Sequence, residues 1–247
     1  MGLRTFSREG ERLIIGHRGS AGTHPENTLG SFAAALDSGA DAVEADVRMT
    51  SDGVPVIIHD PQAGEGSGLV HEMTLEQLRA DKAEIPTLHD LLELVDLREG
   101  RVVLEIKNLP GDPGYDPAHE GAVDALAEEL AEFPGMEVLV VSFNPRSIER
   151  CREKVKGAAT GFLTTAAMDP RVALRYARDA GHEWVLPNVS AVLSAGEDLV
   201  SEIHDAGVCL GTWTVDDPAE VARLLAWGVD GLVTNLPADA VAIRNGS

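Results

Sequence analysis

Short apolar segments alternate with amphipathic segments along nearly the whole chain. The apolar segments are four to six residues long and resemble buried strands, whereas the amphipathic segments between them show helical periodicity. The predicted strands are Leu13–His17, Ala42–Val47, Val102–Lys107, Val138–Phe143, Ala158–Leu163, Trp184–Pro187, Val208–Thr212 and Gly231–Thr234. The predicted helices are Thr28–Ser38, Leu88–Leu97, Ala118–Phe133, Arg146–Lys154, Arg171–Ala180, Asp198–Ala206, Ala219–Trp227 and Ala238–Arg244. This alternation indicates a parallel sheet with crossover helices.

Eight such strands are the number that closes a (β/α)8 TIM-type barrel, and 247 residues suit that fold. A doubly wound open sheet is the alternative, but neither of the common glycine-rich phosphate loops is present. No linker or low-complexity tract divides the sequence. We therefore expect one barrel domain over residues 1–247, with an insertion at about residues 48–86.

A β-hairpin is expected at the start of that insertion. Asp52-Gly53 lies between apolar, β-prone runs, which is a strong hairpin signal. With a two-residue turn at this dipeptide, Ser51 faces Val54 and Asp46 faces His59. The hairpin then carries His59 back over Asp46 and Glu44, which share a strand face. A register shift of one residue would reverse that face, and an ordinary amphipathic hairpin with solvent-facing polar residues is the alternative.

Composition and charge restrict the possible partners. The formal net charge of −21 argues against a nucleic-acid partner, whose phosphates would be repelled. No apolar run reaches the roughly 18 residues of a membrane-spanning helix. The first residues lack the apolar segment of a secretion signal, so a cytoplasmic protein is expected. Two cysteines, Cys151 and Cys209, make neither a disulfide framework nor a zinc cluster.

Ionisable residues gather at the carboxyl ends of the predicted strands, where TIM-type barrels carry their active sites. The first strand ends at His17, the second carries Glu44 and Asp46, and the third carries Glu105 and Lys107. Carboxylates buried among parallel strands are unfavourable unless a cation neutralises them. An oxygen-only set of Glu44, Asp46 and Glu105 suits one divalent ion, Mg²⁺ or Ca²⁺. A structural ion pair of Glu105 with Lys107 or a neighbouring arginine is the alternative.

Two cationic side chains and two histidines complete the candidate chemistry. Arg18 and Lys107 are candidate phosphate-binding groups, and a salt bridge of Arg18 to a barrel carboxylate is the alternative. His17 and His59 are candidate proton carriers, because imidazole titrates near neutral pH. Trp213 follows the seventh strand and is expected to form a wall of the pocket. The remaining histidines are expected at the rim or the surface: His24, His71, His89, His119, His182 and His204.

Six motifs in this order resemble the glycerophosphodiester phosphodiesterase family. They are H-R-G at His17–Gly19, P-E-N-T at Pro25–Thr28, G-A-D-x-x-E-x-D-V at Gly39–Val47, T-x-D-G-x-x-V-x-x-H-D at Thr50–Asp60, E-I-K at Glu105–Lys107 and W-T-V at Trp213–Val215. The resemblance implies a TIM-type barrel that hydrolyses glycerophosphodiesters to an alcohol and glycerol 3-phosphate. It further implies metal ligands, general acid–base residues and phosphate-binding residues at the positions singled out above. Glu26 and Asn27 match the P-E-N-T motif and are expected to support the site.

Two departures from the family pattern concern specificity. Many members carry a longer segment with Arg-Thr-Thr after the second histidine, whereas this chain has a short Gly-rich stretch, Gln62–Gly68. Members often read T-D-x-P near the end, whereas this chain reads Thr234-Asn235-Leu236-Pro237. A small-diester hydrolase with His17 as base and His59 as acid is the favoured hypothesis. A lysophospholipase D-like phosphodiesterase and a non-catalytic barrel that binds a phosphorylated ligand are the alternatives, and the oligomeric state is not predicted.

Overall fold

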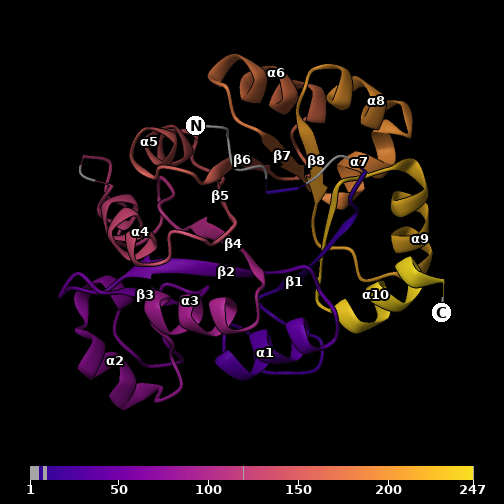
Figure 1. The fold of residues 1–247 in the computed structure, drawn as a ribbon. Coiled ribbons are helices and arrows are strands. Elements are labelled where there is room, and N and C mark those ends of the chain that lie inside the picture. The colour runs from indigo at the N-terminus through magenta and orange to yellow at the C-terminus, as the bar shows by residue number, and fades with distance from the viewer. Residues whose placement is uncertain (1–5, 8–9, 119, 247) are drawn as a thin grey trace.

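Eight parallel strands close into a barrel in the computed structural model, which describes residues 6–7, 10–118 and 120–246 (Figure 1). Hydrogen bonding follows the order β1-β9-β8-β7-β6-β5-β4-β2, and β1 also pairs with β2 to close the ring. The ninth strand, β3, is the antiparallel arm of the hairpin. The expected (β/α)8 TIM-type barrel is confirmed. The strands are β1 (Leu13–His17), β2 (Ala42–Met49), β3 (Pro55–Ile57), β4 (Arg101–Ile106), β5 (Val138–Ser142), β6 (Ala159–Thr164), β7 (Trp184–Pro187), β8 (Cys209–Thr212) and β9 (Gly231–Thr234).

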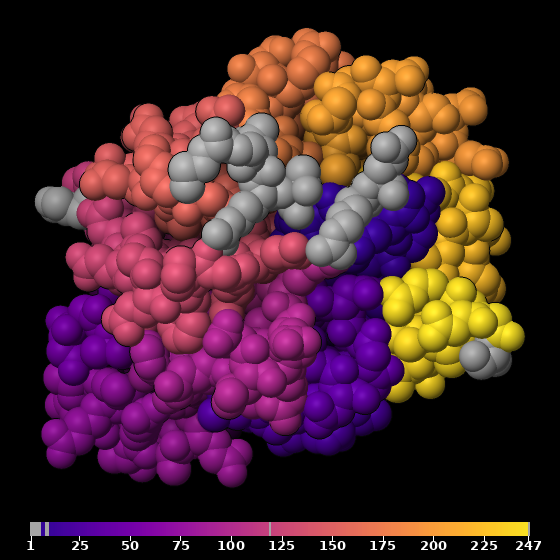
Figure 2. All heavy atoms as spheres, in the orientation of Figure 1, coloured from indigo at the N-terminus to yellow at the C-terminus, as the bar shows by residue number. Residues whose placement is uncertain are grey.

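Helices surround the barrel, and the C-terminal segment lies beside the N-terminal strand in both views (Figures 1 and 2). The predicted helices correspond to α1 (Leu29–Asp37), α3 (Leu88–Leu97), α4 (Gly121–Glu132), α5 (Pro145–Lys154), α6 (Pro170–Ala180), α8 (Asp198–Asp205), α9 (Pro218–Trp227) and α10 (Pro237–Asn245). Position 119, inside the predicted Ala118–Phe133 helix, lies outside the described residues. The structure also contains helices that the sequence pattern did not predict: α2 (Leu75–Asp81), α7 (Val189–Ala195) and the short 3-10 helix η1 (Val70–Glu72). Within the described residues, no helix combines the length and apolarity needed to cross a membrane.

Helix starts follow local sequence signals. Asn144, Asp169 and Asp217 each precede a proline and accept a hydrogen bond from a backbone amide of the first helical turn. The missed helix α2 has a capping box in which Thr74 and Gln77 bond reciprocally. Its seven residues are too few for a clear periodicity, which explains why the pattern did not reveal it.

The barrel interior is packed around Trp184 of β7, which is 1% exposed. Phe6 meets its indole edge-on, with ring centroids 5.9 Å apart. Gly161 on the neighbouring strand leaves room for the side chain of Leu186, since a Cβ at position 161 would lie 2.6 Å from Leu186 Cδ1. Apolar packing thus fills the lower barrel, and ionisable side chains are left to the carboxyl-terminal end.

The hairpin register differs by one residue from the prediction. Val47 pairs with Ile57, and the Ile58 amide donates to the Asp46 carbonyl at 2.9 Å, so Asp46 faces Ile58 and not His59. The turn has three residues between Thr50 and Val54, with Gly53 left-handed at φ 80°. Ile58 is buried in a small core of the excursion with Val56, Val70, Leu78 and Ile85. That core explains the register, because a one-residue shift would turn Ile58 out of it.

Replacing Trp184 should therefore destabilise the barrel strongly. We expect Trp184→Ala to lower the free energy of unfolding by about 3–5 kcal/mol, because removal of the indole leaves a cavity in the packed interior of the barrel. The matched control is Trp227→Ala at the partly exposed end of α9, which should have a clearly smaller effect. Urea unfolding followed by circular dichroism measures both. Equal losses in the two variants would contradict the packing described here.

Candidate active site

Three carboxylates meet at the carboxyl-terminal end of the barrel. Glu44 and Asp46 lie on β2 and Glu105 on β4, and the register pairs Asp46 with Glu105 across the two strands. Each residue offers one oxygen atom within 4.8 Å of the others. Their exposures are 5%, 1% and 8%, so the cluster is almost removed from solvent. Strand alternation places the side chains on one face, as the sequence predicts.

The proximity and burial of these carboxylates perturb their ionisation. Burial raises the pKa of Glu44 to about 8, and the charge of Asp46 contributes further. Burial raises the pKa of Glu105 to about 7 against the opposing effect of Lys107. Asp46 behaves differently, because Lys107 and Arg18 outweigh its burial and lower its pKa. Without a cation of higher charge, the three groups are not all readily ionised at neutral pH.

The donor set fits a divalent ion that prefers oxygen ligands. Asp46 Oδ1 and Glu105 Oε1 are buried and have no hydrogen-bond donor of good geometry. Lys107 Nζ lies 3.0 Å from the first of these atoms and 2.6 Å from the second, so it supplies the local positive charge. Carboxylate oxygens without nitrogen or sulfur ligands suit Mg²⁺ or Ca²⁺ better than zinc.

Arg18 and its loop surround the other side of Asp46. The Arg18 amide donates to Glu44 Oε2 at 3.1 Å, and its Nε lies 3.1 Å from Asp46 Oδ2. Its Nη1 donates to Glu26 at 2.8 Å, and Asn27 Nδ2 donates to Asp46 Oδ2 at 2.8 Å. Glu26 and Asn27 are thus joined to the cluster through Arg18 and Asp46. Arg18 and Asn27 have left-handed backbones at φ 50° and 55°, a strain that often marks functional loops.

The backbone conformation and close packing at position 19 require the glycine of the H-R-G segment. Its φ is 84°, and a Cβ there would lie 2.5 Å from the Ser31 backbone carbon of α1. Ser31 Oγ also donates to the Arg18 carbonyl at 2.9 Å. The loop is therefore pressed onto α1, and this contact holds Arg18 over the carboxylates.

His17 reaches the cluster from β1. Its Nε2 lies 4.0 Å from Glu44 Oε2, and its Nδ1 lies 2.8 Å from Asn235 Oδ1. Burial lowers the pKa of His17, and the neighbouring Arg18 lowers it further, although Asn235 opposes them. Asn235 and its partner Asp216 were not among the predicted site residues. The signal that could have revealed Asn235 is its position directly after the last barrel strand.

His59 lies at the rim of the site, after the end of β3. Its side chain is 37% exposed, and its Nδ1 lies 2.8 Å from Asp60 Oδ1. Arg48 fixes the backbone here, since its Nε donates to the His59 carbonyl at 2.8 Å. The charge of His59 is a minor contribution to the lowered pKa of Asp46, after those of Lys107 and Arg18. The backbone bends at His59 and Asp60, beyond the last paired residue of β3, and the register predicted from a two-residue turn was wrong.

Trp213 forms part of an apolar wall beside the carboxylates. It directly follows β8, its Nε1 donates to the Leu186 carbonyl at 2.9 Å, and its ring meets Phe143 edge-on at 5.3 Å. A cavity of about 20 Å³ separates this wall from His17 and the glutamates. It is lined by His17, Glu44, Val103, Glu105, Val141, Leu163, Leu186, Trp213 and Val233.

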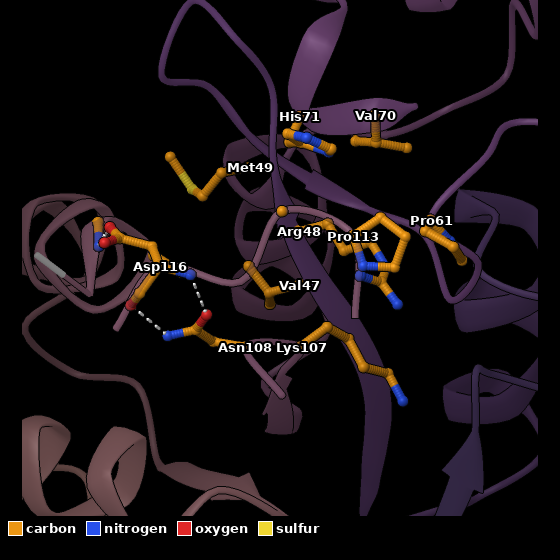
Figure 3. Close-up of a pocket in the computed structure, with 13 residues that line it drawn as sticks. Val47, Arg48, Met49, Pro61, Val70, His71, Lys107, Asn108, Pro113 and Asp116 are labelled. Atoms are coloured by element: carbon orange, nitrogen blue, oxygen red, sulfur yellow. Dashed lines mark hydrogen bonds between the residues drawn. The ribbon is translucent and has the colours of Figure 1, made fainter. Parts of the chain in front are cut away.

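A second cavity, of about 140 Å³, lies beside the site between the hairpin excursion and the loop after β4 (Figure 3). Its floor is largely apolar, with Val47 and Met49 of β2. Asn108 and Asp116 fix the loop through two hydrogen bonds of 2.9 and 2.8 Å, drawn as dashed lines (Figure 3). Lys107 extends away from Asp116 in this view (Figure 3), and its Nζ lies 2.6 Å from Glu105 Oε1.

The other predicted surface histidines differ in their environments. His24 is exposed beside Thr23, whereas His71, His89 and His204 are at least partly exposed. His182 is 3% exposed, and its Nδ1 lies 2.8 Å from Thr160 Oγ1, so the surface assignment was wrong for this residue. His119 lies outside the described residues.

The fold and the site together define a (β/α)8 barrel with a buried acidic centre flanked by two histidines and two cations. The model of the glycerophosphoryl diester phosphodiesterase family matches residues 17–239. A glycerophosphodiester phosphodiesterase from Caldanaerobacter subterraneus is 31% identical over 91% of this chain and 94% of its own length.

Solved structures agree with this match. A crystal structure described as a glycerophosphoryl diester phosphodiesterase from Silicibacter pomeroyi superposes with a TM-score of 0.83 at 28% identity, covering 99% of this chain and 96% of the other. A phosphodiesterase from Oleispira antarctica, solved with its product sn-glycerol-3-phosphate, has a TM-score of 0.82 at 24% identity and covers 94% and 96%. The chain belongs to the glycerophosphoryl diester phosphodiesterase family. The family and the enzyme class that the motifs implied are confirmed.

The raised pKa values predict a pH dependence of the metal-free protein. Folded Glu44 and Glu105 bind protons more tightly than the unfolded chain, where the ordinary value is 4.5. Their stabilising contribution is therefore complete below pH 4.5 and is lost as the pH rises through about 7 to 8. We therefore expect the difference between the urea midpoints of the wild type and Glu44→Gln to change with pH when a chelator is present. The wild-type midpoint should fall relative to that of the variant as the pH rises over this range.

Saturating Mg²⁺ or Ca²⁺ should reduce this pH dependence, because the ion replaces the protons. Glu76→Gln on the exposed face of α2 is the matched control and should follow the wild type. A wild-type midpoint that rises between about pH 5 and about pH 8 relative to Glu44→Gln would contradict the assignment.

Proposed function

We propose that this chain is a metal-dependent phosphodiesterase that hydrolyses glycerophosphodiesters to an alcohol and sn-glycerol 3-phosphate. The observation that carries the proposal is the convergence of Glu44, Asp46 and Glu105 within 4.8 Å, with Arg18 and Lys107 directly on them. A cluster of buried ionisable groups with perturbed pKa values at the mouth of a barrel is typical of a functional site. The family membership supplies the reaction class.

Glu44, Asp46 and Glu105 would hold one divalent ion, Mg²⁺ or Ca²⁺. When bound, the ion supplies Lewis-acid polarisation of a phosphoryl oxygen. Arg18 and Lys107 are 17% and 7% exposed, so their charges are only weakly screened. They would bind the remaining phosphate oxygens and stabilise charge that develops on them.

His17 and His59 would carry the protons. The two rings approach the cluster from β1 and from the hairpin excursion, and each is bonded through Nδ1, to Asn235 and Asp60 respectively. Nε2 is therefore the free nitrogen of each ring. One histidine would take the proton of the attacking hydroxyl and the other would protonate the leaving alcohol.

Trp213 and the apolar side chains beside it line the space next to the two glutamates. In a glycerophosphodiester hydrolase, these side chains would pack against the carbon atoms of the glycerol moiety. Glu26 would support the site by orienting Arg18, and Asn27 by orienting Asp46.

The first test is metal-dependent release of glycerol 3-phosphate. Purified protein with added Mg²⁺ or Ca²⁺ should hydrolyse glycerophosphocholine, measured with a glycerol-3-phosphate dehydrogenase assay, and chelation should abolish the signal. Glu44→Gln should bind the ion weakly in calorimetry. Full activity after thorough chelation would overturn the metal assignment, and faster turnover of lysophosphatidylcholine would favour the lysophospholipid alternative. Ligand binding without turnover would favour the non-catalytic barrel.

The second test addresses the histidines. His17→Ala and His59→Ala should each lower kcat by about 10²–10⁴-fold, because each removes a proton carrier. His89→Ala, on the outer face of α3 where His89 pairs with Glu129, is the matched control and should retain wild-type turnover. Wild-type turnover of His59→Ala would exclude the rim histidine from the reaction.

A further inference from the structure

Behind His17, Asn235 and Asp216 form a hydrogen-bonded pair. Asn235 follows β9 and Asp216 lies in the segment after β8. Asn235 Nδ2 donates to Asp216 Oδ2 at 2.6 Å, and His17 Nδ1 lies 2.8 Å from Asn235 Oδ1. The three side chains form a continuous line from the loop after β8 to the metal-binding carboxylates.

The pair is held in place by the backbone. Asp216 Oδ1 accepts from the Asn235 amide at 2.8 Å and from Thr234 Oγ1 at 3.0 Å. Thr234 Oγ1 in turn accepts from the Leu236 amide at 3.1 Å. Because Asp216 is anchored by these bonds, its Oδ2 is presented to Asn235 in a fixed direction.

Asp216 determines which end of the Asn235 amide faces His17. An ionised carboxylate only accepts hydrogen bonds, so the NH₂ group must point to Asp216 and the carbonyl oxygen to the imidazole. The reverse orientation would set an amide oxygen against a carboxylate oxygen at 2.6 Å. A carbonyl oxygen only accepts, so His17 Nδ1 must carry a proton. In the neutral ring Nε2 then has a free lone pair, and Nε2 is the atom that faces Glu44.

We infer that Asp216 and Asn235 are positioning residues that fix the tautomer and orientation of His17, so that its Nε2 accepts the proton in the reaction. The inference rests on the proposed phosphodiesterase function. It assigns His17 as the proton acceptor and His59 as the proton donor, which the proposed function left open. The nucleophile's O–H proton moves to His17 Nε2 as its oxygen forms the new P–O bond. The P–O bond to the alcohol breaks, and the leaving oxygen takes a proton from His59. Exchange with solvent returns both histidines to their starting states.

The same geometry accounts for the departure from T-D-x-P at Thr234-Asn235-Leu236-Pro237. A carboxylate at position 235 would lie against the Asp216 carboxylate, and two like charges in hydrogen-bond contact are unfavourable. The amide at 235 and the carboxylate at 216 are thus complementary. Exchanging the two groups would preserve a donor–acceptor pair and would still present an acceptor to His17.

The reciprocal exchange gives the test. We expect Asn235→Leu, Asn235→Asp and Asp216→Asn each to lower kcat for glycerophosphocholine by about 10²-fold, with KM changed by less than about threefold. The double variant D216N/N235D should recover to within about tenfold of the wild type, because the acceptor for His17 Nδ1–H is restored. Asp217→Asn is the matched control, since Asp217 only caps α9 and asparagine caps equally well.

A readout independent of activity is the ¹⁵N NMR spectrum of the His17 ring, assigned with His17→Gln. In the neutral wild type, Nδ1 should be protonated and Nε2 unprotonated, and Asp216→Asn should reverse or mix the tautomers. A protonated wild-type Nε2, wild-type kcat in Asn235→Leu, or a double variant no better than the single ones would each overturn the inference. An inactive wild type with the expected tautomer would instead count against the proposed function alone.

Discussion

The arrangement of the site depends on the repulsion among three carboxylates that are almost fully buried at the carboxyl-terminal end of the barrel. Glu44, Asp46 and Glu105 share one end of two paired strands, and burial and mutual charge raise the pKa of both glutamates. The surroundings of the cluster reduce that repulsion, because Lys107 contacts two of the carboxylates and Arg18 lies against Asp46. The same negative potential would attract a divalent ion, so the repulsion among the carboxylates and the proposed metal binding have one cause.

Some side chains of the site lie on barrel strands, and others lie on the segments that follow these strands. The lower barrel is filled by Trp184 and its apolar neighbours, which are buried. The carboxylates lie on strands, whereas Arg18 and His59 lie on the segments that follow them. Contacts that fix those segments, such as Gly19 against Ser31 and Arg48 to the His59 carbonyl, therefore help to define the site geometry.

The two histidines are held by different kinds of partner. His17 is buried and bonded to a neutral amide, whereas His59 is partly exposed and bonded to the Asp60 carboxylate. The amide is itself oriented by Asp216, so the environment of His17 extends to a loop after β8. This asymmetry supports the proposal that the two rings have different roles in one reaction.

Much of the fold and part of the site were determined by the sequence alone. The alternation of apolar and amphipathic segments gave eight strands, and alternation along β2 placed Glu44 and Asp46 on one face, because both depend on local periodicity. The hairpin register was decided by tertiary packing, since the burial of Ile58 and a three-residue turn displaced the expected Asp46–His59 pairing. The contacts of His17 with Asn235 and of Asn235 with Asp216 also needed the closed barrel. Barrel closure joins β1 to β9, residues more than two hundred positions apart, and no local pattern encodes that contact.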